Sequence, residues 1–177
     1  NTGAGRRAIA ILRELHLQGC ADLGSNKVAL ETLQKCLCSP FCSMLHLLDM
    51  SGCFELDDWT MKMIALHVPT SLRVLRLRDL VQLSGAGFSA LAKRCCGLRD
   101  LVISGCTGLR TIGGSNSWGA LQVLEAAGVQ HVPACEWRSV LGRCRHQLRR
   151  LVLCESYVGN DALLAAAAPE PTLSSTP

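Results

Sequence analysis

The stretch LRDLVISGC, residues 98–106, decides the fold of this chain, because closely similar stretches recur along the sequence. Five other segments align with it as L-x-x-L-x-L-x-x-C with substitutions. They are LRELHLQGC (12–20), LHLLDMSGC (45–53), LRVLRLRDL (72–80), LQVLEAAGV (121–129) and LRRLVLCES (148–156). Successive copies start 33, 27, 26, 23 and 27 residues apart. A regular period of this length is typical of a solenoid.

Each copy predicts a short strand followed by a helix. The apolar fourth and sixth positions alternate with polar or mixed residues, which indicates a strand with one buried face. Apolar residues then recur at offsets of 3, 4 and 7, as on one side of a helix. These are Met61, Ile64, Ala65 and Val68 in the second copy, Phe88, Leu91, Ala92 and Cys95 in the third, and Trp137, Val140, Leu141 and Cys144 in the fifth. One unit cannot bury both surfaces alone, so the units should stack and align their strands in parallel.

These patterns predict an α/β solenoid, with a curved parallel sheet on the concave side and helices on the convex side. The six repeats should span residues 12–168, after a short lead-in or cap remnant at 1–11. We expect a tail at 169–177, rich in Ser, Thr and Pro, to be disordered. A chain that starts at Asn1 rather than Met also suggests a fragment of a larger protein.

Two copies should depart from the regular unit. The first is lengthened by CLCSPFC (36–42), and its helix, from about Val28 to Leu37, should end before Pro40. The fourth has only TIGGSNSWG (111–119) before the next strand, which predicts a loop or a single turn in place of a helix. The segment ALLAAAAPEP (162–171) can complete a last helix before Pro169.

Composition limits the classes of function. The chain has 177 residues, 49% of them apolar, and a net charge of +4, which falls short of the concentrated positive charge typical of nucleic-acid binding. No apolar run is long enough for a transmembrane helix. Its eleven cysteines are odd in number, and several recur at fixed repeat positions. We therefore expect them to be reduced, and the protein to be cytoplasmic or nuclear.

The repeats resemble a known family. The strand ending GC, a leucine three residues later (Leu23, Leu56, Leu109) and a helix such as FSALAKRCCGL are similar to the cysteine-containing leucine-rich repeats of F-box/leucine-rich-repeat proteins. The resemblance covers about residues 10–165 and implies a horseshoe that binds a substrate or partner protein. In that family an F-box elsewhere in the chain docks on a cullin-type (SCF) ubiquitin ligase. No F-box-like segment occurs here, and residues 1–11 are too few to hold one.

The cysteines favour a structural role. Cys20, Cys53 and Cys106 stand at the ninth repeat position, where a small apolar side chain suits a buried corner and the preceding glycine relieves crowding. Cys42, Cys95 and Cys144 should be buried in the same way. An alternative is a zinc site formed by Cys36, Cys38, Cys42 and His46, but structural zinc sites usually show two separated pairs of ligands.

Catalysis is not expected. The five histidines are scattered over different repeats, and none accompanies a cysteine in a recognisable catalytic pattern. The glycines at 85–87 and 113–114 form runs too short for a phosphate-binding loop and lack the lysine of a Walker motif. We expect neither an enzyme nor a bound cofactor or metal.

The predicted partner-binding residues lie on the concave face, to which the third, fifth and seventh positions should point. They are Leu47, Asp49, Val74, Arg76, Arg78, Asp100, Val102, Val123, Glu125, Arg150 and Val152. Five of them form a predicted exposed apolar band: Leu47, Val74, Val102, Val123 and Val152. Exposed aliphatic residues on a broad open face favour a protein partner, although valines also simply favour strands. Acidic residues interrupt any basic stripe, so nucleic acid is not expected, nor is a membrane.

We expect a protein-interaction module without enzymatic activity. The resemblance implies substrate recognition for an SCF-type ubiquitin ligase. The alternative is a repeat scaffold in a cytoskeletal or regulatory assembly with no role in ubiquitin transfer.

Overall fold

The computed structural model describes residues 11–113, 118–156, 158 and 163–164. Six three-residue strands form one parallel sheet in the order β1-β2-β3-β4-β5-β6, which is also their order along the chain. The strands are β1 (Glu14–His16), β2 (Leu47–Asp49), β3 (Val74–Arg76), β4 (Asp100–Val102), β5 (Val123–Glu125) and β6 (Arg150–Val152). The fold is therefore α/β with a single parallel sheet, as the leucine pattern predicts.

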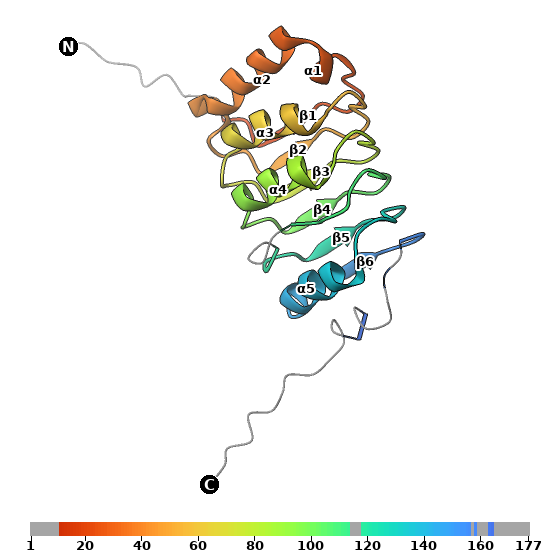
Figure 1. Cartoon of the computed structure of the whole chain (residues 1–177). Coiled ribbons are helices and arrows are strands. Elements are labelled where there is room, and N and C mark those ends of the chain that lie inside the picture. The colour runs from red at the N-terminus through yellow and green to blue at the C-terminus, as the bar shows by residue number, and fades with distance from the viewer. Residues whose placement is uncertain (1–10, 114–117, 157, 159–162, 165–177) are drawn as a thin grey trace, which may run out of the picture.

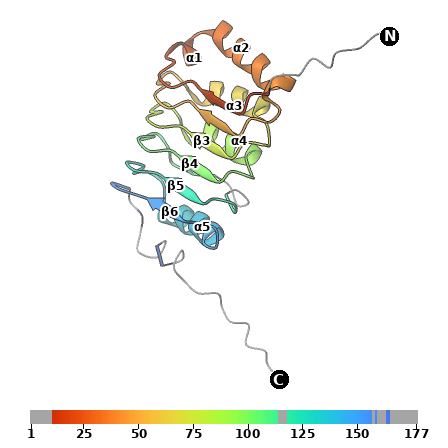
Figure 2. The same cartoon turned by 180° about the vertical axis from the view of Figure 1, so that it is seen from behind.

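The helices lie on one face of this sheet and leave the other face open (Figures 1 and 2). They are α1 (Asp22–Ser25), α2 (Lys27–Cys38), α3 (Asp58–His67), α4 (Gly85–Arg94) and α5 (Ala134–Cys144), with a short 3₁₀ turn, η1, at Pro40–Cys42. The helix predicted at Val28–Leu37 is confirmed and ends before Pro40. No described residue between β4 and β5 is helical, as expected from the short glycine-rich connection. Within the described residues, no helix has the length and apolar character that crossing a membrane requires.

The strand register follows the leucine alignment of the sequence. Leu15, Leu48, Leu75, Leu101, Leu124 and Leu151 pair across the five strand junctions. The four central leucines are buried, whereas Leu15 and Leu151 at the two ends of the sheet are only partly covered. All twelve helix-stripe residues predicted for the second, third and fifth copies are buried. Strand and helix thus bury their apolar sides against each other and against the neighbouring copies.

A buried tryptophan lies in the connection between β4 and β5, in which no described residue is helical. Trp118 is completely buried, with its ring centroid 5.7 Å from that of Phe88 on α4. Its indole Nε1 donates a hydrogen bond to the carbonyl of Ile112. One large aromatic side chain therefore contributes buried apolar area to the core at this connection.

The chain turns out of each strand through a left-handed residue at the eighth repeat position. Glycine occupies this position in four copies, with φ between 69° and 78° for Gly19, Gly52, Gly105 and Gly128. Asp79 and Glu155 take the same position in the other two, with φ of 60° and 57°. Positive φ is the reason for glycine here, in addition to the relief of crowding that the sequence predicts.

The last predicted helix, at residues 162–171, and the predicted tail at 169–177 lie outside the described residues, except that Leu163 and Leu164 are helical. The lead-in at 1–11 is described only at Ile11.

Candidate functional site

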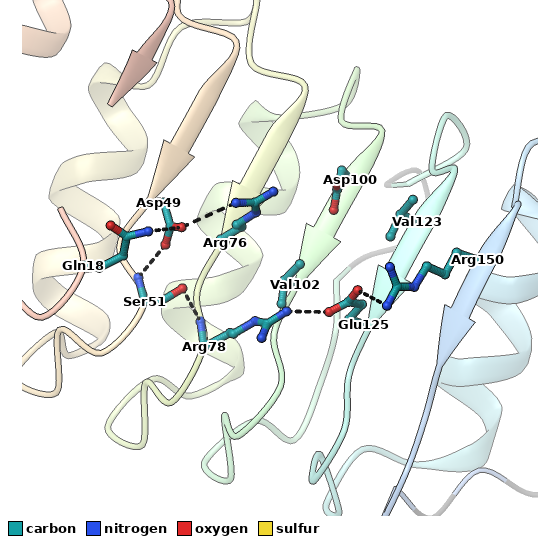
Figure 3. A pocket seen from close by; sticks show the side chains of 10 residues that line it. All are labelled: Gln18, Asp49, Ser51, Arg76, Arg78, Asp100, Val102, Val123, Glu125 and Arg150. Atoms are coloured by element: carbon teal, nitrogen blue, oxygen red, sulfur yellow. Dashed lines mark hydrogen bonds and ion pairs between the residues drawn. The ribbon is translucent and has the colours of Figure 1, made fainter. Parts of the chain in front are cut away.

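The open face of the sheet carries a hollow of about 540 Å³. We call it the open-face pocket; its lining is Gln18, Asp49, Ser51, Arg76, Arg78, Asp100, Val102, Val123, Glu125 and Arg150 (Figure 3). Eight of these ten residues belong to the predicted partner-binding set. Leu47, Val74 and Val152 from that set lie in the same rows of the sheet, outside the lining. Gln18 and Ser51 occupy the seventh position, so the repeat alignment itself would have identified them.

A carboxylate held by two arginines dominates one side of the open-face pocket. Glu125 on β5 lies 2.6 Å from Nη2 of Arg78 and 3.1 Å from Nη2 of Arg150. Arg78 follows β3, so its ion pair with Glu125 spans the intervening strand β4 (Figure 3). The glutamate side chain is largely covered, which strengthens its pairing relative to a fully solvated ion pair. The three side chains therefore link the third, fifth and sixth copies.

The predicted exposure of Val102 is wrong. Val102 lies on β4, between the strands that carry Arg78 and Glu125, and is only 3% exposed. The ion pair between Arg78 and Glu125 spans β4 beside this short side chain (Figure 3), and an alignment of repeat positions cannot show this. The other four residues of the predicted apolar band, Leu47, Val74, Val123 and Val152, are half-buried and reach the surface of the open face.

Asp49 anchors the other side of the open-face pocket. Its side chain is 2% exposed and accepts hydrogen bonds from Gln18 Nε2 at 2.8 Å and from the backbone N–H of Ser51 at 3.0 Å. Arg76 lies 3.9 Å away, within reach of an ion pair. A buried carboxylate with several donors is fixed in orientation, so Asp49 also fixes the side chain of Gln18 that contributes to the pocket wall.

Asp100 is the least satisfied acid of the open-face pocket. Its Oδ1 is buried and accepts no hydrogen bond within the described part of the chain. Burial raises the pKa of Asp100 above its ordinary value, and the carboxylate of Glu125 acts in the same direction, whereas Arg76, Arg150 and Arg78 favour the charged form. At the centre of the sheet, two influences thus favour the neutral form of Asp100 and three arginines favour its charged form.

The pocket as a whole is electrically balanced. Three carboxylates, from Asp49, Asp100 and Glu125, face three guanidinium groups, from Arg76, Arg78 and Arg150. Such a surface offers both donors and acceptors at fixed positions but no excess charge for a polyanion.

The cysteines mostly behave as the sequence predicts. Cys42, Cys53, Cys95, Cys106 and Cys144 are buried, and all eleven cysteines are free. Burial raises the pKa of Cys95 and Cys106 to about 12 and is the largest cause that raises that of Cys42 to about 11. Burial thus favours the protonated form of these thiols at neutral pH, which is a poor nucleophile.

The ninth-position thiols also make a specific contact. Cys53 Sγ donates to the carbonyl of Leu17, and Cys106 Sγ donates to that of Leu77. Ser156 donates through its hydroxyl to the carbonyl of Ala126 in the same way. In each case the acceptor is the sixth position of the preceding copy, so the side chain ties adjacent copies together.

The predicted burial of Cys20 is wrong. Cys20 stands at the same ninth position in the first copy, and it is exposed. The buried thiols at this position rest on the copy before their own, and the described residues contain no copy before the first. Leu15 and Leu17 of the first copy are also only partly buried, and no described copy precedes them either.

The four residues of the alternative zinc site do not come together. Cys36 Sγ and Cys42 Sγ lie 3.5 Å apart, but Cys38 Sγ contacts Nδ1 of His67, at 2.9 Å. No group of three or more His, Cys, Asp or Glu residues that could hold a metal occurs among the residues that the structure describes. The buried Cys42 packs where the chain returns to β2, whereas Cys38 lies exposed at the end of α2.

Comparison with known proteins adds no relative. Neither the protein-family models nor the curated proteins gave a match to this chain.

Proposed function

We propose that this chain is a leucine-rich-repeat module that binds a protein partner on its open face. In this proposal the six-stranded sheet is the concave wall of a curved solenoid, and the helices form its convex side. The observation that carries the proposal is the open-face pocket, in which side chains from all six strands or their ends surround one hollow. A surface spread over so many copies suits a macromolecule better than a small ligand.

The chemistry of the pocket supports a protein partner. Its charged side chains are held by one another, as in the pairing of Glu125 with Arg78 and Arg150, so little side-chain freedom is lost on binding. Half-buried aliphatic residues such as Leu47 and Val123 adjoin these charges. Fixed polar groups beside apolar area are the usual composition of a protein interface.

The cellular role follows from the resemblance of the repeats. F-box/leucine-rich-repeat proteins use such a face to select substrates for an SCF-type ubiquitin ligase, and this is the context we propose. Eleven free cysteines support a reducing compartment, the cytosol or nucleus. The second candidate is a scaffold without ligase coupling, which would use the same face.

Affinity capture of the complete protein, followed by mass spectrometry, tests the proposal. The bait is compared with the double variant Leu47→Asp/Val123→Asp, which places two charges on the half-buried rows of the open face. We expect the variant to lose at least one protein that the wild type captures, because burying an unpaired carboxylate in an interface is unfavourable.

The matched control is Val28→Asp/Val81→Asp, since these two valines are 70% and 50% exposed and lie away from the pocket. This control should retain the partner. Equal capture by the wild type and both variants would contradict binding on the open face. Cullin-ligase subunits among the captured proteins would favour the ligase role, and an open-face partner without them would favour the scaffold.

A further inference from the structure

A second surface of the molecule has a charge pattern that the open-face pocket does not explain. It lies at the edge of the sheet where the strands begin and the helices end. In the stretches 32–46, 61–73, 88–99 and 139–149, which run from the helices to the second repeat position, there is no Asp or Glu. The same stretches contain Lys35, Lys62, Arg73, Lys93, Arg94, Arg99, Arg143, Arg145 and Arg149.

Backbone hydrogen bonds place the second repeat positions in one row. The N–H groups of His46, Arg73, Arg99, Gln122 and Arg149 each donate to the carbonyl of the corresponding residue in the preceding copy, beginning at Arg13. Strands in a sheet lie about 4.8 Å apart, so this row brings four arginines to a single edge. Cations at the carboxyl ends of the helices interact favourably with the helix dipoles. This interaction does not explain why arginines also occur where the strands begin.

A groove on the helix side opens next to this edge. It has a volume of about 400 Å³ and is lined by Lys62, Ala65, Leu66, Ala90, Lys93 and Arg94 from α3 and α4. Leu66, in the last turn of α3, is 65% exposed in this groove. The groove therefore combines an apolar floor with three cations.

The cations of the groove differ in how they are held. Arg94 Nε donates to the carbonyl of Val68 at 3.0 Å, which fixes the guanidinium at the end of the groove. Lys62 and Lys93 are exposed and make no hydrogen bond or ion pair with the part of the chain that the structure describes. Two unpaired ammonium groups beside an exposed leucine are complementary to a segment that carries both carboxylates and an apolar side chain.

We propose that the groove between α3 and α4 is a docking site for an acidic protein segment with an apolar anchor residue. The anchor packs on Ala65, Leu66 and Ala90, and carboxylates on either side pair with Lys62 and Lys93. This surface is separate from the open face, so the molecule can hold two protein segments at once. The apolar floor favours a peptide over a nucleic acid, because it has no aromatic ring on which a base could stack.

Fluorescence anisotropy with a defined probe tests the site. The probe is a labelled helical peptide of about 12 residues, roughly 18 Å long, that carries glutamates around a central leucine pair. A second peptide has glutamine in place of every glutamate, and a single-stranded DNA of similar length is the third probe. We expect the acidic peptide to bind at physiological salt at least about tenfold more tightly than the glutamine peptide or the DNA.

Charge reversal locates the binding. Lys62→Glu/Lys93→Glu should weaken binding of the acidic peptide by about tenfold or more, since two attractive pairs become repulsive. The control Lys27→Glu/Arg110→Glu changes the net charge equally on the opposite edge of the sheet, where both residues are exposed, and should change affinity by less than about twofold. Circular dichroism melts confirm that both variants are folded.

Other outcomes would overturn the proposal. These are no binding of the acidic peptide, tighter binding of the DNA, or equal loss of affinity in the control variant. The open-face variant Leu47→Asp/Val123→Asp should bind the acidic peptide as the wild type does. Loss of peptide binding in that variant would place the segment in the open-face pocket and also overturn the proposed groove.

Discussion

Single residues that join one copy to the next determine much of this structure. Cys53, Cys106 and Ser156 each donate to a carbonyl of the preceding copy, and Asp58 of α3 accepts from the backbone N–H groups of Ser84 and Gly87 at the start of α4. Each of these bonds links residues 26 to 36 positions apart in sequence. Removal of one such side chain should therefore affect two copies rather than one.

Asp57 at the start of α3 gives a pH-dependent prediction. Its carboxylate accepts from the Thr60 N–H at 2.8 Å, and this hydrogen bond is the largest cause that lowers the pKa of Asp57. The folded state favours the charged form of Asp57, so the carboxylate stabilises the fold at pH values above its pKa in the unfolded chain, near 3.8. This stabilisation is lost as the pH falls through the lower pKa of the folded state. We expect Asp57→Ala to lose about 0.5–2 kcal/mol of unfolding free energy at neutral pH.

Urea unfolding of wild type and variant at neutral pH and at about pH 2 measures this effect. The difference should shrink at the lower pH. Asp57→Asn is the control, because asparagine caps helices about as well and does not titrate. A loss that is equally large at both pH values would mean that the charge of Asp57 makes no contribution.

At the scale of strands and helices, the position of an element within the stack should determine how much it contributes to the free energy of unfolding. Leu101 of β4 is 1% exposed between two neighbouring strands, whereas Leu151 of β6 lies at the end of the described sheet and is only partly buried. Leu101→Ala should cost about 2–5 kcal/mol of unfolding free energy, as for a buried leucine. Leu151→Ala should cost clearly less, because less apolar area is lost. Equal losses in urea unfolding would contradict the role of stacking.

The sequence predicts these elements well where they depend on a local repeating pattern. The leucine spacing identifies all six strands and their register, and the offsets of 3, 4 and 7 identify the buried sides of α3, α4 and α5. The pattern does not reveal that Trp118 is buried in the core. Its ring contacts Phe88, which is distant in sequence and belongs to another copy.

In the open-face pocket, too, the repeat pattern predicts the positions of residues but not the contacts between copies. The rows of third, fifth and seventh positions predict eight of its ten lining residues. The repeat position does not predict the burial of Val102, because it does not reveal the ion pair between Arg78 and Glu125 that spans β4 beside this residue. The hydrogen bond from Gln18 of the preceding copy to the buried Asp49 is likewise a contact that the pattern does not reveal. Interactions between copies modify positions that are equivalent in sequence.

At the scale of the whole molecule, the two ends of the described stack differ from its centre. Cys20, Leu15 and Leu17 are more exposed than the residues at the same positions of the second copy, where Cys53, Leu48 and Met50 are completely buried. Stability should accordingly be greatest in the central copies and decrease toward both ends.

The most direct test of the central claim, that neighbouring copies stabilise one another within one parallel sheet, is hydrogen–deuterium exchange of the wild type and Leu101→Ala by mass spectrometry. In the wild type the amides of β3, β4 and β5 should exchange more slowly than those of β1 and β6. In the variant exchange should accelerate in β3 and β5 as well as in β4, because both strands pair with β4. Acceleration confined to residues 98–106, or slowest exchange at β1, would contradict the claim.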